Sequence, residues 1–311
     1  MKPGPRLTTA ILALLILIWG STWAVIRVGL VGIPPLTGVA LRFGIASLLL
    51  FSIGFARKVP FGRGRHEKAL WVSTALLSFC ISYVVVYWGE QYVPSGLAAV
   101  LWATFPLMVA VMAHFLIPGE RIRPITIVGT LIGFLGVGVI YSEDFGLLGG
   151  PKVLFASIVF LVSPFVSAIS NVLIKRWGKD VHPISLSAVP MGITFGVIGA
   201  IALVAEHGRP VDFNGTSLAA LLFLAVLGSA VTFGLYYWLL TFHAATRLSM
   251  IAYGTPLLAV VIGTTIMKEP LTPRVLVGGA LVLAGVVLAV GNWNYRERRP
   301  AGAPAAATRG R

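Results

Sequence analysis

The sequence predicts an all-α polytopic membrane protein, with ten transmembrane helices arranged as two inverted five-helix repeats. Three observations support this prediction. The 311 residues are 57% hydrophobic and only 11% charged, with a mean hydropathy of +0.92, whereas soluble domains carry about 25% charged residues. Apolar segments of about 20 residues, the length that crosses a bilayer, recur along the chain. The residues that shape the helical backbone also recur, in one register, in the two halves of the sequence.

The expected spans follow one another with short connections. We place them at Leu7–Val31, Pro35–Ala56, Ala69–Gly89, Pro94–Ile117, Ile125–Tyr141, Val153–Ile174, Ile184–Ala205, Leu218–Thr241, Leu248–Met267 and Val275–Trp293. The apolar run of the first span is too long for a signal peptide and no clear cleavage site follows it, so we expect an uncleaved helix. Residues 296–311 are rich in Ala, Pro, Gly and Arg. That composition predicts a disordered cytoplasmic tail.

The two halves share prolines, glycines and turn acids at matched positions. Tyr87-Trp88 corresponds to Tyr237-Trp238, and Pro106-Leu107 corresponds to Pro256-Leu257 at the same offset. After one skipped residue, the matches continue from Glu120, Pro124, Gly129, Gly136 and Val137 to Glu269, Pro273, Gly278, Gly285 and Val286. We infer an internal duplication. The first repeat occupies residues 1–145 and the second occupies residues 146–295.

The positions of lysine and arginine predict the orientation. If both termini are cytoplasmic, eighteen of the 24 basic residues lie in cytoplasmic segments, and Arg42 lies inside a span. The five on the outer side are Arg27, Lys152, Arg209, Lys268 and Arg274. Cytoplasmic loops of membrane proteins are enriched in Lys and Arg. Because each half has an odd number of spans, the halves enter the membrane in opposite directions, an architecture typical of transporters with a substrate site near the midplane.

Composition also excludes several other functions. A net charge of +14 would suggest nucleic acid as a partner of a soluble protein, but here the basic residues lie between apolar spans, so we expect none. Cys80 is the single cysteine, which leaves no disulfide framework and no metal-ligand spacing. The five histidines and ten acidic residues are scattered rather than clustered, and no phosphate-binding loop occurs. We therefore expect no metal, no cofactor and no enzymatic activity.

Longer runs of sequence resemble a known family. The segment from Glu90 to Leu101 reads EQYVPSGLAAVL and is followed by Pro106-Leu107, Gly119-Glu120-Arg121 and a glycine series that ends at Gly138. With Trp19-Gly20-Ser21-Thr22 and Leu41-Arg42-Phe43, it is similar to the repeated domain of the drug/metabolite transporter superfamily, EamA type. The resemblance spans Leu7 to Asn292 and implies ten helices, cytoplasmic termini and export of a metabolite. The second half departs from it, because Phe242-His-Ala-Ala-Thr246 stands where the first half has Tyr92-Val-Pro-Ser-Gly96.

The expected substrate site consists of aromatic and polar helix faces inside the spans. Trp19, Trp23 and Arg27 share one face of the first helix because they are spaced at i, i+4 and i+8. Ionisable groups inside a membrane span normally face the bundle interior or a wet cavity. The substrate-binding candidates are Trp19, Trp23, Arg42, Phe79, Tyr83, Tyr87, Trp102, Ser163, Ser167, Asn171 and Tyr253. The alternatives are core packing for the aromatic residues, helix-end contacts for Arg42 and helix–helix hydrogen bonding for the serines.

The expected gating residues are Arg27, Glu90, Pro106 and Pro256. Arg27 and Glu90 lie at similar depths, so they form either an outer ion pair or part of the ligand site. The two prolines occupy matched mid-span positions, where proline bends a helix, and a static kink is the alternative to gating. We expect Glu120 and Glu269 to cap the fifth and tenth helices. The glycines of those helices favour packing within a monomer, with dimerisation as the alternative.

These features predict a secondary or facilitative transporter in the bacterial inner membrane. Its partners would be the lipid bilayer and a small amphipathic metabolite, with amino acids and related zwitterions favoured, exported by alternating access between the repeats. The alternative is a proton-coupled exporter of cationic drugs or amines. It is weakened because the first span, Leu7–Val31, contains no acid, although Glu90 and His114 remain candidates for proton coupling. A remote alternative is an integral membrane enzyme.

Overall fold

The computed structural model describes residues 3–62, 64–117, 124–142, 148–240, 242, 248 and 251–291. Within these residues all regular structure is helical, as expected. Eight helical stretches are long and apolar enough to cross a membrane, and two further apolar helices are shorter, Gly254–Thr265 and Pro273–Ala289. The all-helical character of a membrane protein is therefore confirmed.

The helices of the first half begin and end close to the expected positions. They are α1 (Pro5–Gly29), α2 (Pro35–Ala56), α3 (Arg65–Thr74), η1 (Ala75–Ile81), α4 (Ser82–Gly89), α5 (Ser95–Trp102), α6 (Phe105–Leu116) and α7 (Pro124–Tyr141). Proline stands in the first turn of α1, α2 and α6. The missing N–H of proline costs nothing there, because the first turn of a helix has no intrahelical acceptor for it.

The second half follows the same sequence of helices. They are α8 (Pro151–Phe160), α9 (Val162–Trp177), α10 (Pro183–Ala205), α11 (Gly215–Ala225), η2 (Val226–Val231), α12 (Thr232–Leu240), α14 (Ile251–Thr265) and α15 (Pro273–Gly291). Among the described residues, the segments α2, α3–η1–α4, α6 and α7 have counterparts in α10, α11–η2–α12, α14 and α15, whereas the break between α8 and α9 has no counterpart in α1. That break lies at Leu161, in the first long helix of the second half, whereas α1 is continuous.

Two π-helical turns interrupt long helices at matched positions of the two halves. The segment η1 lies between α3 and α4, and η2 lies between α11 and α12. A π turn inserts an extra residue into the helical hydrogen-bond ladder, and such turns are frequent at functional sites. Neither turn was visible in the apolar pattern, because both segments are as hydrophobic as their surroundings.

The two prolines expected to kink helices at mid-span differ in the structure. Pro106 lies in the first turn of α6, after the chain leaves α5 at Trp102. Pro106 thus lies in the middle of the span Ser95–Leu116, as expected, but the helix is interrupted between Trp102 and Phe105 rather than continuously bent. Pro256 lies inside α14, as expected.

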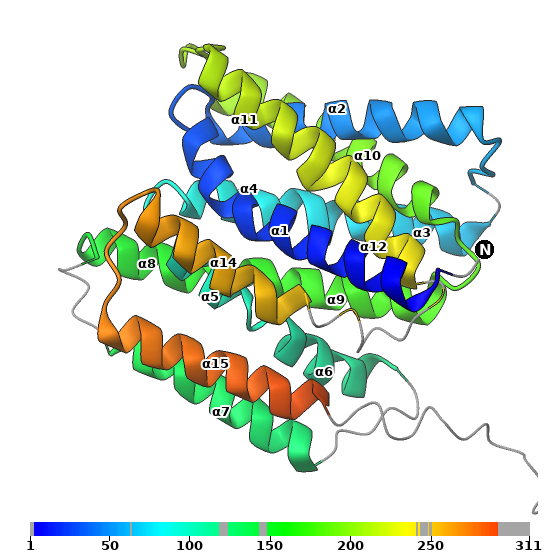
Figure 1. Cartoon of the computed structure of the whole chain (residues 1–311). Helices are drawn as coiled ribbons and strands as arrows, with labels where there is room; N and C mark the ends of the chain where they lie inside the picture. The colour runs from blue at the N-terminus through cyan, green and yellow to red at the C-terminus, as the bar shows by residue number, and fades with distance from the viewer. Residues whose placement is uncertain are drawn as a thin grey trace, which may run out of the picture.

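Helices from the two halves pack against one another in corresponding pairs. Helix α2 packs along α10 and α7 packs along α15, and each pair joins the equivalent helices of the two halves. Likewise α1 contacts α14 while α6 contacts α9. Figure 1 shows α7 and α15 side by side along one side of the bundle, with α2, α10 and α11 on the opposite side. Apart from Arg42 of α2 and Leu248, the cavity described below is lined by residues on or next to α1, η1, α4, α5, α6, α9, α12 and α14, and none of its lining residues belongs to α7, α15, α10 or α11.

Close backbone contact between α7 and α15 explains their glycines. A Cβ atom on Gly129 would lie 2.5 Å from the Gly285 carbonyl oxygen, and one on Gly136 would lie 2.5 Å from that of Gly278. Small residues at such positions let membrane helices approach closely. The expected role of these glycines in packing within one chain agrees with these contacts.

We predict that Gly129→Ala will destabilise the folded protein by about 1–3 kcal/mol, because the new methyl group overlaps the α15 backbone. Thermal unfolding in detergent would measure the change. Gly138→Ala, in the same helix, is the control, because nothing lies within 4 Å of its added Cβ. Equal melting temperatures for the two variants would contradict the proposed contact.

Two buried carboxylates bind the start of helices that are distant in sequence. Glu206 accepts hydrogen bonds from the backbone N–H groups of Leu36 and Thr37, at the first turn of α2. Glu269 accepts from Ser95 N, Ser95 Oγ and Gly96 N, at the first turn of α5. A carboxylate suits the positive end of a helix. The expectation that Glu269 caps the tenth helix is therefore wrong, while Glu120 lies outside the described residues.

Candidate functional site

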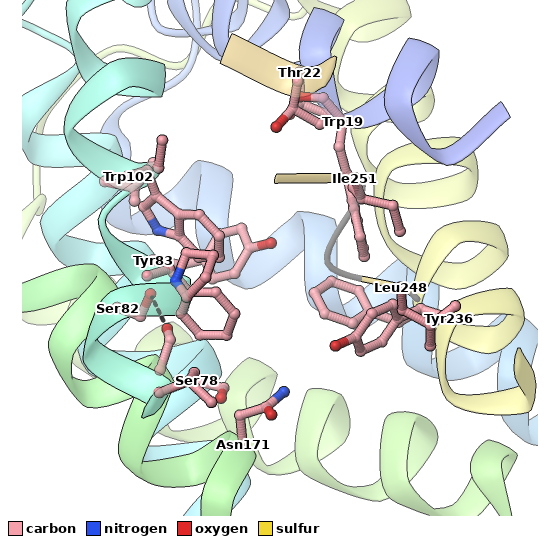
Figure 2. Close-up of a pocket in the computed structure, with 18 of the residues that line it drawn as sticks. Trp19, Thr22, Ser78, Ser82, Tyr83, Trp102, Asn171, Tyr236, Leu248 and Ile251 are labelled. Atoms are coloured by element: carbon pink, nitrogen blue, oxygen red, sulfur yellow. Dashed lines mark hydrogen bonds between the residues drawn. The ribbon is translucent and has the colours of Figure 1, made fainter. Parts of the chain in front are cut away.

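A cavity of about 250 Å³ lies between the two halves of the bundle. Its lining comes from both halves, and Figure 2 shows Trp102, Tyr83 and Ser82 on one side facing Trp19, Thr22 and Ile251 on the other. The full lining is Trp19, Thr22, Trp23, Ile26, Arg42, Ser78, Ser82, Tyr83, Val86, Ala99, Trp102, Ala103, Phe105, Pro106, Val109, Ala110, Ala113, Ser167, Asn171, Lys175, Phe233, Tyr236, Tyr237, Leu248, Ile251 and Thr255.

Aromatic rings make up much of the cavity surface. Trp19 of α1 packs against Phe233 and Tyr236 of α12, with ring centroids 5.5 Å apart in both pairs. Trp23, one turn further along α1, lies 6.3 Å from the ring of Trp102 on α5. Offset and edge-to-face ring pairs are favourable and hold their members in defined orientations. The cavity therefore offers a fixed apolar surface to a ligand.

Arg42 is the charged group inside this aromatic surface, and its side chain is only 1% exposed. Its Nε donates to Ser229 Oγ at 2.8 Å and its NH2 group donates to the Gly228 carbonyl oxygen at 3.1 Å. Both acceptors belong to the π turn η2. The guanidinium also lies 4.8 Å from the ring centroid of Tyr83, within cation–π range.

No carboxylate among the described residues pairs with Arg42. Its NH1 group is buried and has no hydrogen-bond partner in the described part of the chain. A buried charge without a counter-charge is costly, and a guanidinium presents donors in the fork geometry that matches a carboxylate. The arrangement can therefore accept an anionic group.

Serines connect α4 and α9 on the side of the cavity that carries Tyr83 and Trp102. Ser82 Oγ of α4 lies 2.8 Å from Ser163 Oγ and accepts a hydrogen bond from Ser167 Oγ, both on α9. Trp102 Nε1 donates to Ser163 Oγ at 3.1 Å. The serine stripe thus acts as a hydrogen-bonded contact between helices, and Ser167 also lines the cavity.

We predict that Ser163→Ala will lower stability by about 1–3 kcal/mol, because the Trp102 N–H and the Ser82 hydroxyl each lose a buried partner. Thermal unfolding and the intrinsic tryptophan fluorescence would measure the effect. Ser52→Ala is a suitable control, because that exposed hydroxyl bonds only to its own helix backbone at Leu48. Unchanged stability together with unchanged fluorescence would argue against the network.

The structure brings together most, but not all, of the expected site residues. Trp19, Trp23, Arg42, Tyr83, Trp102, Ser167, Asn171 and Pro106 line the cavity. Three others belong to the packed interior: Phe79 lies between Phe43 and Phe233, Tyr87 packs on Gly38, and Ser163 is buried behind Trp102. Tyr253 lies in α14, and its side chain falls outside the described residues. Pro256 is not among the lining residues.

Sequence reasoning missed several lining residues. Phe233, Tyr236 and Tyr237 come from α12, and Thr22 and Ser78 add hydroxyl groups. The match of Tyr87-Trp88 to Tyr237-Trp238 did mark the α12 segment as significant. It did not show which face of that segment points inward, because the π turn η2 shifts the register of the helix.

The expected ion pair between Arg27 and Glu90 is wrong. Arg27 NH1 lies 3.4 Å from Glu269 Oε1 and donates to the Val93 carbonyl oxygen at 3.0 Å. Glu90 is fully buried, and neither of its carboxylate oxygens has a hydrogen-bond partner among the described residues. Arg27 is thus paired, but with the acid that also caps α5.

The cavity does not extend to this group of residues. Ile26 is the last lining residue of α1, and Val86 is the last of α4. At the opposite end the lining reaches the exposed Lys175 near the end of α9. We call the group of Arg27, Glu90, Ser95 and Glu269 the closed-end cluster, because it lies beyond the last lining residues.

The apolar helices enclose a mixed aromatic and polar cavity, which is the architecture expected of a membrane transport protein. Residues 7–142 and residues 154–291 each match the EamA-like transporter family. The chain belongs to this family and is an integral membrane transporter.

Relatives from several organisms agree with this assignment. The chain is 30% identical over 294 residues to the uncharacterized inner membrane transporter YedA of Escherichia coli K12, covering 93% of this chain and 92% of YedA. It is 27% identical over 282 residues to the uncharacterized transporter YoaV of Bacillus subtilis, covering 90% of this chain and 96% of YoaV. A solved crystal structure that is 20% identical superposes with a TM-score of 0.66, covering 90% of this chain and 95% of the other, which shows a shared fold.

Proposed function

We propose that this transporter exports small amphipathic metabolites that carry a carboxylate, with amino acids and related zwitterions as the favoured substrates. The observation behind the proposal is the buried Arg42, which has an unpartnered NH1 group and lies in a cavity walled by tryptophan and tyrosine. The guanidinium would bind the carboxylate, while the aromatic rings would contact the apolar part of the substrate.

The charge of the cavity bears on the competing proposal of a cationic drug exporter. Among the described residues that line the cavity, Arg42 and Lys175 are basic and none is acidic. A cationic ligand would therefore meet like charges, which disfavour binding. The ammonium group of a zwitterion could instead lie over the rings of Trp19, Trp23 or Tyr83 through cation–π contact.

We propose alternating access between two inverted repeats as the mechanism. The matched π turns η1 and η2 support it, and so does the pairing of α2 with α10 and of α7 with α15. With the N-terminus in the cytoplasm, the cavity mouth near Lys175 would face the cytoplasm and the closed-end cluster would face outward. The arrangement would then be the inward-open form, which receives a substrate for export.

Reconstitution into liposomes tests this proposal. Radiolabelled amino acids, the corresponding amines and the corresponding carboxylic acids would be compared for transport, each with and without a pH gradient. We expect the carboxylate-bearing compounds to be transported and the amines to be excluded. Transport of amines alone would reverse the assignment in favour of a cation exporter. Substitution of cavity residues such as Arg42 should reduce this transport.

A further inference from the structure

Glu90 is a buried carboxyl group with an unusual environment. It lies one residue beyond the end of α4, in the connection to α5, and its side chain is 0% exposed. Neither carboxylate oxygen has a hydrogen-bond partner in the described part of the chain. An ionised carboxylate in such a place would lose its hydration without replacement, which is costly, so the neutral acid is the favoured form.

The charged neighbours of Glu90 act in opposite directions. Burial raises the pKa of the Glu90 carboxyl well above its ordinary value, the Glu269 carboxylate raises it further, and the Arg27 guanidinium lowers it. Arg27 pairs with Glu269 through NH1, which also donates to the Val93 carbonyl oxygen, and no ion pair joins Arg27 to Glu90 among the described residues. Other ionisable residues of α4 and of the helices that pack against it include Tyr87, Arg42 and Lys152. Tyr87 lies one turn earlier on α4, Arg42 lies on α2, and Lys152 of α8 is exposed. Helix α5 contributes no ionisable residue.

The contacts around Glu90 join segments that are far apart in sequence. Glu269, just before α15, binds the first turn of α5 through Ser95 and Gly96. It also pairs with Arg27 at the end of α1. The closed-end cluster therefore links the two halves of the chain across the end of the bundle where the cavity stops.

We propose that Glu90 is a proton-binding site, and that the bound proton stabilises the closed conformation of this end of the transporter. Loss of the proton places a second negative charge beside Glu269, and the ionised Glu90 then competes with Glu269 for the Arg27 guanidinium. Both effects weaken the contacts that join α1, α5 and the segment before α15. In an open conformation water would reach Glu90, and its pKa would return toward the ordinary value of about 4.3.

The direction of the pH effect follows from linkage. A carboxyl group whose pKa is raised in the closed form favours that form at low pH, and the benefit is lost as the pH rises through the raised pKa. Acidic solution at this end therefore favours closure, and alkaline solution favours opening. The site itself does not depend on the proposed substrate, but its consequence for export rests on the proposed function.

Infrared difference spectroscopy of the purified full-length protein tests proton binding directly. We expect a protonated-carboxyl C=O band in the wild type that disappears at a pH well above the ordinary titration range of glutamate and is absent in Glu90→Gln. Glu269→Gln should move that disappearance to lower pH, because a neighbouring negative charge is removed and Arg27 is released. A merely structural role for Glu90 would produce no such shift. If the wild type has no such band, or if Glu90→Gln retains it, the site is not a proton site.

Cysteine labelling tests closure separately. In a Cys80→Ser background, a cysteine at the buried position Leu97 in α5 would report opening through its rate of reaction with a maleimide. The labelling rate is measured in two proteins that both carry the cysteine at position 97, one with Glu90 and one with Glu90→Gln. We expect the ratio of the first rate to the second to increase at least several-fold as the pH rises. The ratio cancels the intrinsic pH dependence of the thiol. A constant ratio would overturn the link to closure. Neither experiment uses a substrate, so their failure is distinguishable from failure of the proposed export function.

Discussion

Arg42→Gln is expected to reduce transport of carboxylate-bearing substrates about 10- to 100-fold while the protein remains folded in the membrane. A hydrogen bond to a charged group contributes about 1.5–3 kcal/mol, and glutamine cannot supply the charge or the forked donor geometry. The apparent KM should rise, because substrate binding is lost. Transport by reconstituted protein at several substrate concentrations would measure the change.

The substrate itself provides the sharpest control for this prediction. The amide or methyl ester of a transported acid lacks the negative charge, so any transport of it should differ little between wild type and Arg42→Gln. Arg57→Gln removes an exposed arginine immediately after the same helix and should leave transport unchanged. If Arg42→Gln impaired the acid and its amide equally, Arg42 would be a structural residue rather than the anion-binding group.

Glu269→Ala should cause the largest loss of stability among the changes considered. The carboxylate is 8% exposed, accepts three hydrogen bonds from Ser95 and Gly96, and pairs with Arg27. Alanine leaves the first turn of α5 without acceptors and Arg27 without its counter-charge. Because Arg27 is 34% exposed, water screens part of that cost. We expect a loss of about 3 kcal/mol, or a decrease in melting temperature of roughly 5–10 °C.

Two acidic residues serve as comparisons for Glu269→Ala. Asp180 is exposed, and Asp180→Ala should change the melting temperature by less than about 1 °C. Glu206 binds the start of α2 through two backbone N–H groups and Thr37 Oγ, so Glu206→Ala should destabilise in the same direction as Glu269→Ala. A Glu269→Ala protein as stable as Asp180→Ala would show that the closed-end contacts contribute little to the folded state.

The spacing of aromatic residues predicted part of the site because helical periodicity places residues four apart on one face. Trp19 and Trp23 line the cavity for this reason. The same reasoning failed for Phe79 and Tyr87, which share a face but pack into the interior. The cavity lining of this span is Ser78, Ser82, Tyr83 and Val86, so the face that points into the cavity is offset from the face that carries Phe79 and Tyr87. Helical spacing shows which residues share a face, but not which face points into a cavity.

The closed-end cluster could not be predicted from local sequence. The depth of Arg27 and Glu90 along their helices is readable from the chain, but depth does not determine the partner. Glu269 pairs with Arg27 because the segment before α15 folds back over the first turn of α5. In sequence, Glu269 is 174 residues from Ser95 and 173 residues from Gly96. Only the packing of the two halves decides which acid receives a partner and which, like Glu90, has none.

The sequence by itself showed that this protein lies in a lipid bilayer, that it is helical and that it belongs to a transporter family. It could do so because long apolar spans and recurring prolines and glycines are local properties of the chain. The tertiary structure decided where those helices are interrupted, which aromatic faces enclose the cavity, and which buried charges are paired. The physical reason is that burial and pairing depend on contacts between distant segments. Arg42 and Glu90 are both single ionisable residues in apolar surroundings, and only the folded chain places one against the cavity and the other beyond its closed end.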